Sequence, residues 1–309
     1  MTPPRSHLPA AAAGTGRLGD LTVNRLGFGA MRTTGTGGMD RGEPRDRDTS
    51  IAVIRRAVEL GVDHIDTAAF YFSALLSANE LVNSALAAYP RNDRDRIVVA
   101  TKVGPHRDPS GEWWTARPDQ IRGLVEENLR QLGRDHLDLV NLRLMPSMTS
   151  LVDHLGALVE CREAGLLRHL GVSNVSLEQL EAAVALTEIV CVQNRHALGY
   201  QRPDAAGVIG RCAELGIAFV PFFTIAGDAR EASVASRQDE PEAVRRVAAA
   251  HGATSAQIRL AWCLHQGPHV LAIPGTGDPG HVTENVAAAK IRLTDQELAM
   301  LAGLDVPSD

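Results

Sequence analysis

The chain has 309 residues, of which 44% are hydrophobic and 22% are charged, and its formal net charge is -6. These values are typical of a globular protein with a sizeable core. The negative charge gives no basic field for binding nucleic acid or an anionic membrane. Four cysteines without a CxxC pair argue against a disulfide framework and favour a reducing cytoplasm. No apolar segment approaches the ~20 residues of a membrane-spanning helix.

The N-terminal segment is rich in proline, alanine and glycine and lacks the apolar stretch of a signal peptide. We interpret residues 1–16 as a flexible tail and residues 17–309 as a single domain, because no Pro- or Ser-rich linker divides the latter. The tail also spells GxGxxG at Gly14, Gly16 and Gly19. No strand precedes this motif, so it does not indicate a nucleotide site.

Short β-branched segments alternate with amphipathic segments along the chain. After the second arm of a hairpin at 21–24, predicted strands cover 26–31, 63–67, 97–102, 137–142, 168–172, 189–193, 217–221 and 270–273. Predicted helices cover about 48–60, 78–88, 118–132, 151–159, 177–186, 204–215, 241–250 and 255–265, followed by one that ends at 289 and a short one after 294. Strict alternation implies parallel strands with helices outside. The pattern predicts an α/β fold, a (β/α)8 barrel with an N-terminal hairpin and extra helices.

Three predicted strands end in ionisable residues, and a tyrosine follows one of them. Asp66, Lys102 and Arg143 end the second, third and fourth strands, and Tyr71 lies five residues after Asp66. Reactive groups of such barrels lie at the carboxyl ends of the strands, and adjacent strands are ~5 Å apart. An ammonium beside a phenol favours phenolate, so Tyr71 is a candidate proton donor to a carbonyl oxygen. The alternative is a structural ion pair with an ordinary loop tyrosine.

A glycine-rich segment, residues 273–280, follows the last strand and precedes a helix. Gly275, Gly277 and Gly280 spell GxGxxG, and glycine-rich backbone at a helix N-terminus binds anions. The acidic residue that a Rossmann unit needs about 20 positions later is not clearly placed. We therefore expect phosphate binding at the end of a barrel.

Polar and aromatic residues at the later strands suggest a site for a flat ring with an amide. Ser173, Asn174 and Gln193 end the fifth and sixth strands, and Phe219 lies in the seventh. Their amides would hold a carboxamide and the aromatic ring would stack on the flat ring. The alternative is ordinary capping and core packing.

Other aromatic and histidine residues are less informative. Trp113 and Trp114 form either a substrate-facing wall or a packed loop anchor, and we favour the wall. His265 and His269 are four residues apart, but a Gly-Pro pair between them interrupts a helix. We therefore expect no metal site.

Together these motifs resemble the aldo-keto reductase family. The resemblance is carried by residues 25–29, 63–68 with Tyr71, 100–102, 171–174, 192–194, and 273–276 with Glu284 and Asn285. Through residues 141–143 and 220–223 the chain is most similar to bacterial members grouped with pyridoxal reductases. The resemblance implies NADPH-dependent reduction of an aldehyde or ketone without a metal, so the expected partner is a small-molecule carbonyl substrate.

The resemblance also implies roles for particular residues. Asp66, Tyr71 and Lys102 match three of the four catalytic positions, with Tyr71 as the proton donor. The matching cofactor positions divide into a nicotinamide end with Ser173, Asn174, Gln193, Phe219 and Pro221, and an adenosine-phosphate end with Gly275, Thr276, His281, Glu284 and Asn285.

The chain departs from the family pattern at several positions. Arg143 replaces the usual catalytic histidine; it stays charged and cannot share a proton, but it can bind a carbonyl oxygen or a substrate anion. Phe72 replaces the glycine that usually follows the tyrosine and reshapes the substrate pocket. Gly275 and His281 stand where many members have Lys and Arg against the 2′-phosphate, so the expected preference for NADPH rests on Thr276 and a protonated His281.

Other functions remain open on the sequence. Arg143 and Phe72 are compatible with a cofactor-binding regulatory or scaffold protein with little turnover. A related alternative is a reductase of an imine or of a specialised biosynthetic intermediate. A Schiff-base lyase using Lys102 is disfavoured, because Asp66 would keep the amine charged.

Overall fold

The computed structural model describes residues 7–36, 43–108, 110–148, 150–200, 202, 204–225 and 240–304. Its main sheet is parallel and has seven strands in the order β11-β10-β9-β8-β5-β4-β3. In chain order they are β3 (Phe28–Gly29), β4 (His64–Asp66), β5 (Val98–Val103), β8 (Leu137–Arg143), β9 (Leu167–Ser173), β10 (Cys191–Gln193) and β11 (Ala218–Phe219).

The predicted eighth strand closes this sheet into a barrel. Val270 pairs in parallel with Phe219 of β11, and Ala272 pairs in parallel with Leu26 just before β3. Leu271 N donates to Phe219 O at 2.9 Å, and Gly27 N donates to Ala272 O at 2.8 Å. The same segment therefore forms backbone hydrogen bonds with both edge strands of the sheet. The barrel is therefore closed, as the alternation of the sequence predicts.

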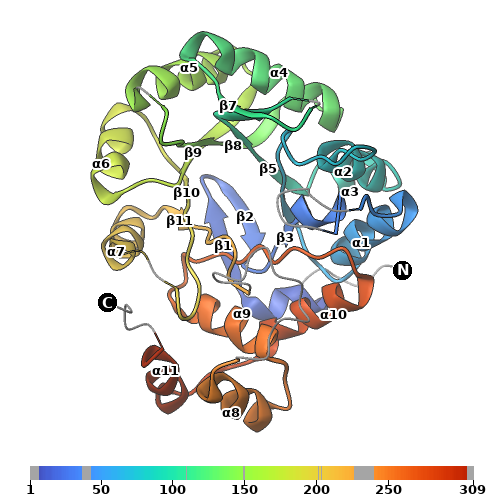
Figure 1. The fold of residues 1–309 in the computed structure, drawn as a ribbon, viewed down its shortest axis with the longest axis vertical. Coiled ribbons are helices and arrows are strands. Elements are labelled where there is room, and N and C mark those ends of the chain that lie inside the picture. Colours follow the sequence, from blue (N-terminus) through green and yellow to red (C-terminus); the bar gives the residue numbers. More distant parts are fainter. Residues whose placement is uncertain are drawn as a thin grey trace.

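Helices form a ring around the strands (Figure 1). They are α1 (Arg47–Glu59), α2 (Ala78–Leu86), α3 (Arg91–Arg94), α4 (Ile121–Leu132), α5 (Leu151–Glu163), α6 (Leu177–Leu186), α7 (Ala205–Leu215), α8 (Glu242–His251), α9 (Ser255–His265), α10 (Pro279–Ala287) and α11 (Asp295–Ala302). Capping explains several boundaries. Ser176 accepts from the backbone of Gln179, whose side chain accepts from the backbone of Ser176, and α6 begins at the next residue.

The barrel interior and the layer under the helices are separate cores. A hairpin of β1 (Thr15–Leu18) and β2 (Leu21–Asn24) closes the end of the barrel at which the strands begin. Leu18 and Val23 of this hairpin pack against interior side chains of the strands, among them Val98, Ala100 and Leu139. The inward positions of β5 continue to Lys102 at its other end, so one strand contributes both to an apolar core and to a polar site.

The N-terminal segment differs from the predicted tail. Residues 9–13 form a 3₁₀ helix, Pro9–Ala13, in which Ala10 and Ala13 are buried. Ala10 N donates to Leu60 O at 2.9 Å, which fixes the segment at the end of α1. Small alanine side chains allow this close approach, so the prediction of flexibility is wrong for residues 7–16. Residues 1–6 lie outside the described chain.

Two local predictions also need correction. The first strand stops at Gly29, because Ala30–Thr33 is a 3₁₀ helix in which the Thr33 hydroxyl donates to Ala30 O at 2.7 Å. The segment with Trp113 and Trp114 contains a hairpin of β6 (Pro105–Arg107) and β7 (Trp113–Thr115) where a loop was expected. Most of the loop predicted over 225–238 lies outside the described residues.

All four cysteines are buried free thiols. No helix in the described ranges combines the length and hydropathy needed to cross a membrane.

Candidate active site

The ends of β4 and β5 bring an acid and a lysine into direct contact. Lys102 Nζ donates to Asp66 Oδ1 at 2.5 Å and to the backbone oxygen of Thr67 at 3.1 Å. Both side chains are almost fully buried, at 2% and 6% exposure. Since a buried charge is stable only when it is paired and hydrogen-bonded, each partner depends on the other.

Tyr71 completes this group from the loop above β4. Its ring centroid lies 4.9 Å from Lys102 Nζ, and its side chain is buried. The loop is fixed by bonds from Tyr71 N to Ala68 O at 3.0 Å and from Ala78 N to Tyr71 O at 2.9 Å. The predicted convergence of the acid, the lysine and the tyrosine is therefore present in the structure.

The electrostatic environment keeps Lys102 protonated. Burial lowers the pKa of Lys102, but the nearby Asp66 carboxylate and Tyr71 phenol raise it by more, so the pKa lies above that of a free lysine. A Schiff base requires a neutral amine. The environment therefore suits a positioned cation rather than a lysine nucleophile.

Arg143 lies at the end of β8 beside the same group. Its Nη1 donates to Ser173 Oγ at 3.3 Å, and its guanidinium lies 4.8 Å from the centroid of the Phe222 ring. Burial lowers the pKa of Arg143, whereas Tyr71 and Asp66 raise it; an arginine stays charged in such a setting. No carboxylate among the described residues forms an ion pair with Arg143, so its charge is available to a bound anion.

Gln193 connects the opposite wall of the barrel to the acid. Its Nε2 donates to Asp66 Oδ2 at 2.6 Å, while its Oε1 is buried and has no partner among the described residues. Asn174 lies beside it in a left-handed conformation, φ 62°, with its backbone N donating to Gln193 O at 3.0 Å. A buried acceptor without a donor is costly, so this position fits the amide N–H of a nicotinamide.

Phe219 does not occupy the predicted place. Its side chain is 1% exposed and belongs to the core between strands and helices, where it contacts the ring of His196 edge-on at 5.9 Å. A cofactor ring in the barrel mouth cannot reach it, so its predicted stacking role is wrong. Pro221, two residues later, is buried as well.

Phe222 is the aromatic residue that the sequence reasoning missed. It is half-buried, lies against the Arg143 guanidinium, and is held by a bond from its backbone N to Asn194 O at 3.1 Å. Ala218 and Val220 face the barrel interior, so Phe219 faces outward. Because alternate residues of a strand face the same side, Phe222 should face inward with Ala218 and Val220. This alternation is the sequence signal that could have identified Phe222.

The residues predicted to contact substrate divide into two groups. Phe72 and Trp113 both lie near Arg107, whose guanidinium is 4.6 Å and 6.0 Å from their ring centroids. Trp113 also contacts Phe70 at 5.5 Å, next to Tyr71, and so joins the wall of the site. Trp114 is 37% exposed and packs on His106, away from this group.

The glycine-rich turn after the last strand lies beside Gly29, the last residue of β3. A β-carbon at position 275 would lie 2.6 Å from Gly29 O, so only glycine fits there. Asp278 accepts from the backbone N of Gly280 at 2.7 Å and of His281 at 3.2 Å, so these amides at the N-terminus of α10 already have an acceptor. The turn is therefore less open to an anion than the motif alone predicts.

The other residues predicted for the adenosine-phosphate end surround this turn. Thr276 Oγ1 accepts from Asp278 N at 3.1 Å. Glu284 Oε1 accepts from the Thr254 hydroxyl at 2.6 Å, and Asn285 is buried in α10. His281 is exposed and Thr276 and Glu284 are half-buried, whereas Asn285 is buried.

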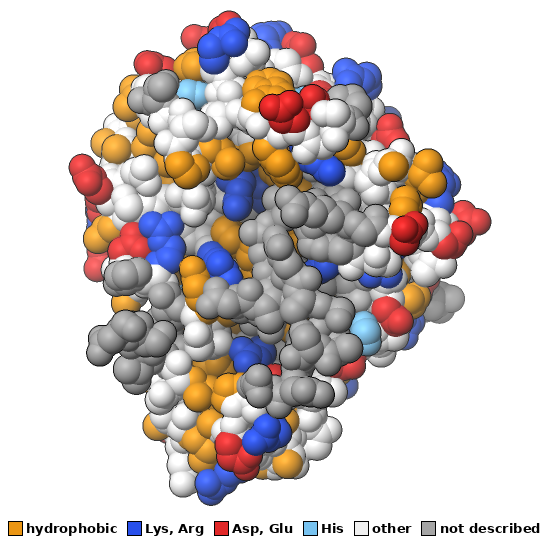
Figure 2. All heavy atoms as spheres, in the orientation of Figure 1, with side chains coloured by type: hydrophobic (Ala, Val, Ile, Leu, Met, Phe, Trp, Pro, Cys, Tyr) orange, Lys and Arg blue, Asp and Glu red, His pale blue; other side chains and the backbone are white. Residues whose placement is uncertain are grey.

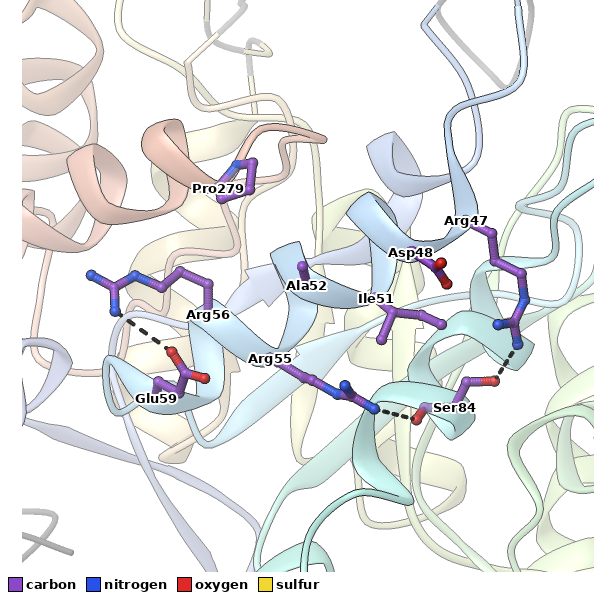
Figure 3. Close-up of a pocket in the computed structure, with 9 residues that line it drawn as sticks. All are labelled: Arg47, Asp48, Ile51, Ala52, Arg55, Arg56, Glu59, Ser84 and Pro279. Atoms are coloured by element: carbon purple, nitrogen blue, oxygen red, sulfur yellow. Dashed lines mark hydrogen bonds and ion pairs between the residues drawn. The ribbon is translucent and has the colours of Figure 1, made fainter.

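A groove of about 610 Å³ runs along the outer side of α1 and is distinct from this site. Figure 3 shows its arginines pointing to partners: Arg47 and Arg55 toward Ser84, and Arg56 toward Glu59. None of the predicted site residues lines it. By contrast, Lys and Arg side chains gather near the middle of the face in Figure 2, over the barrel.

Comparison with known proteins gives matches over most of the chain. The aldo/keto reductase family model matches residues 25–306. The chain is 39% identical to pyridoxine 4-dehydrogenase of Escherichia coli strain K12, over 95% of this chain and 99% of that protein. It is 34% identical to an uncharacterized oxidoreductase of Schizosaccharomyces pombe, over 96% and 91%.

Solved structures share the barrel. The glycerol dehydrogenase of Gluconobacter oxydans superposes with a TM-score of 0.77 at 25% identity, over 96% of this chain and 98% of that one. An aldo/keto reductase of Klebsiella pneumoniae, solved with NADP and acetate, gives a TM-score of 0.74 at 27% identity, over 95% and 96%. These structures confirm the predicted fold class.

Proposed function

Because the chain belongs to the aldo/keto reductase family, an oxidoreductase family as the sequence predicts, we propose that it reduces an aldehyde or ketone to the alcohol with NADPH. The observation that carries the proposal is the buried group of Lys102, Asp66 and Tyr71, with Nζ 2.5 Å from the carboxylate and 4.9 Å from the tyrosine ring. Tyr71 is the proposed proton donor.

The lysine prepares the tyrosine for proton transfer. An ammonium group has three N–H donors, and Asp66 and the Thr67 carbonyl accept two of those of Lys102. The third is free to bond the Tyr71 oxygen and to stabilise the phenolate that forms when the proton leaves. General acid catalysis of this kind contributes ~10²–10⁴-fold to the rate.

The cofactor end of the proposal rests on Gln193 and its neighbours. NADPH, when bound, supplies the hydride. The unpartnered Oε1 of Gln193 accepts from the carboxamide, and Asn174 and Ser173 line the same end of the barrel. Phe222 offers a half-buried ring at the mouth. The NADP complex of the Klebsiella relative supports this choice of cofactor.

Arg143 suggests which carbonyl compounds bind best. Its guanidinium has no carboxylate ion-pair partner among the described residues. It lies close enough to Tyr71 and Asp66 for both groups to raise the pKa of Arg143. We infer that it binds an anionic oxygen next to the reacting carbonyl. The Escherichia coli relative is named a pyridoxine 4-dehydrogenase, and the aldehyde of pyridoxal stands beside a phenolic oxygen. Pyridoxal is therefore our first candidate substrate.

A carbonyl panel followed by NADPH absorbance tests the proposal. We expect turnover with pyridoxal, and a higher kcat/KM for 2-hydroxybenzaldehyde than for 4-hydroxybenzaldehyde, because only the former places its oxygen beside the aldehyde. Tyr71→Phe should lower kcat by ~10²–10⁴-fold while the Kd for NADPH stays unchanged. Full turnover by this variant would contradict the proton-donor role. Absence of turnover with every carbonyl would favour the regulatory alternative.

A further inference from the structure

Arg45 lies directly on the glycine-rich turn, although it comes from the loop before α1. A β-carbon at position 277 would lie 2.1 Å from Arg45 Nε and 2.3 Å from Cζ, so the guanidinium lies directly against the backbone of Gly277. The arginine is held there by its Nε, which donates to Arg32 O at 2.8 Å and Gly35 O at 3.2 Å. Glycine at 277 is therefore what leaves room for Arg45.

The remaining donors of Arg45 have no partner in the described chain. Both recorded bonds of its guanidinium use Nε, and no carboxylate of the described residues forms an ion pair with it. The side chain is half-buried. Its two Nη groups are thus fixed in position and available to a ligand, which is how arginine recognises phosphate.

The turn itself carries the wrong charge for a phosphate. Residues 275–285 contain two acids, Asp278 and Glu284, no Lys or Arg, and one histidine, His281. Backbone bonds from His281 and Gly280 hold the pKa of the Asp278 carboxyl below its usual value, and the charges of His281 and Arg45 act in the same direction. A phosphate at this turn would meet an ionised Asp278, so it needs a cation from elsewhere in the fold.

We propose that Arg45 supplies this cation, binds the 2′-phosphate of NADPH, and makes the chain prefer NADPH over NADH. The inference rests on the proposed NADPH-dependent function. Thr276, which is half-buried, and His281, which is exposed, lie on either side of Gly277 in the sequence and complete the phosphate site. Arg45 thereby replaces the basic residues that the turn does not carry.

Isothermal titration of NADPH and NADH into the purified protein tests this without any turnover. Arg45→Leu should raise the Kd for NADPH about ten- to a hundredfold and change the Kd for NADH less than about twofold, because only NADPH carries the 2′-phosphate. Arg45→Lys should recover part of the affinity. Gly277→Ala should weaken NADPH binding in the same direction, because its β-carbon displaces the guanidinium.

Arg47→Leu is the matched control. Arg47 is an exposed arginine two residues away whose Nη2 donates to Ser84 Oγ at 3.0 Å, and its loss should leave both affinities unchanged. Thermal unfolding of each variant shows that it is folded.

The outcomes separate this inference from the function on which it rests. If the wild type binds NADPH and Arg45→Leu binds it equally well, the inference fails while the function stands. Equal weakening of NADPH and NADH overturns the 2′-phosphate assignment, because it indicates the shared pyrophosphate. If the wild type binds neither nucleotide, the proposed function and this inference both fail.

Discussion

The two ends of the barrel are built from the same strands, but one end has an apolar interior and the other a polar one. At the hairpin end, Leu18 and Val23 fill the interior with apolar surface. At the other end, Asp66, Lys102 and Gln193 fill it with a hydrogen-bonded polar group. Burial of apolar area stabilises the first end by ~25 cal/mol per Å². The second end is stable only because its charges are paired, since burying an unpaired charge is costly.

At the hairpin end, the stability effects of separate substitutions should therefore add. At the polar end, the effect of one substitution should depend on whether its charged partner is still present. A partly satisfied polar network is worse than an apolar core. The following variants break or sharpen that contrast.

Lys102→Met should have the largest effect. It leaves the Asp66 carboxylate buried beside Gln193 without its cation, and we expect the free energy of unfolding to fall by about 3–5 kcal/mol. Turnover should fall at least as far as in Tyr71→Phe, because the phenolate loses its stabilising charge. Urea unfolding and NADPH oxidation measure the two effects separately.

The double variant Asp66→Leu with Lys102→Met makes the polar end resemble the hairpin end. We expect it to be more stable than Lys102→Met alone, because no unpaired charge remains, and to be equally inactive. If the double variant were less stable than the single one, the pairing argument would be wrong.

Leu18→Ala tests the opposite end. The side chain is 1% exposed in the interior core, and its truncation should lower the free energy of unfolding by about 3 kcal/mol. The kcat and KM should stay unchanged in the folded enzyme, because the hairpin lies at the other end of the strands. A large change in kcat at a temperature where the variant is folded would show that the two ends are coupled.

The sequence predicts most of the fold because its signals are local. Alternating β-branched and amphipathic segments identify the strands and helices, and the helix at 177–186 coincides with α6 (Leu177–Leu186). The parallel topology then follows from alternation, and it brings Asp66 and Lys102 together although they are far apart in the chain. This part of the site was predictable because strand ends share one face.

Other features depend on tertiary packing that no local pattern specifies. Phe219 faces away from the barrel interior and Phe222 faces its mouth. The overlooked signal was that Ala218 and Val220 face the interior, so alternate residues should do the same. Arg45 contacts Gly277, which is more than 200 residues away in the chain. It is held in place by a bond to a backbone oxygen, and every residue carries such an oxygen, so the sequence does not reveal the contact. The segment at residues 9–13 is ordered by a close fit of alanines against the end of α1, a fit that composition alone does not reveal.

His196 tests the cost of burying a titratable group outside the ion-paired group of Asp66 and Lys102. It is 1% exposed, is stacked on Trp262 at 5.2 Å, and has no hydrogen-bond partner for either ring nitrogen among the described residues. Burial lowers the pKa of His196 from 6.5 to about 4. The unfolded chain therefore binds a proton that the folded chain rejects between these values, so stability falls as the pH drops below 6.5.

The pH dependence has a matched variant. At pH 5 the loss from His196 should be about 2 kcal/mol relative to pH 7, and His196→Phe should remove this part of the loss while keeping a ring against Trp262. Urea unfolding at pH 5 and pH 7 measures the difference between the two proteins. An identical pH dependence in both would show that His196 does not titrate in this range.

Asn141 should give the smallest effect, and in the stabilising direction. It is fully buried in β8 between Lys102 of β5 and Gly171 of β9, and neither its Oδ1 nor its Nδ2 has a partner among the described residues. A β-carbon at 171 would lie 2.0 Å from its Oδ1, so Asn141 fills the space above that glycine.

Asn141→Leu keeps a branched side chain of similar shape and removes the unsatisfied amide, so we expect stability to rise by about 1 kcal/mol. Asn141→Ala is the control, because it removes the amide but leaves a cavity and should be less stable than the leucine variant. Urea unfolding of the two variants orders them. A leucine variant less stable than the wild type would contradict this expectation and would indicate that the amide of Asn141 has a hydrogen-bond partner, such as a bound water, as the rest of the polar end requires.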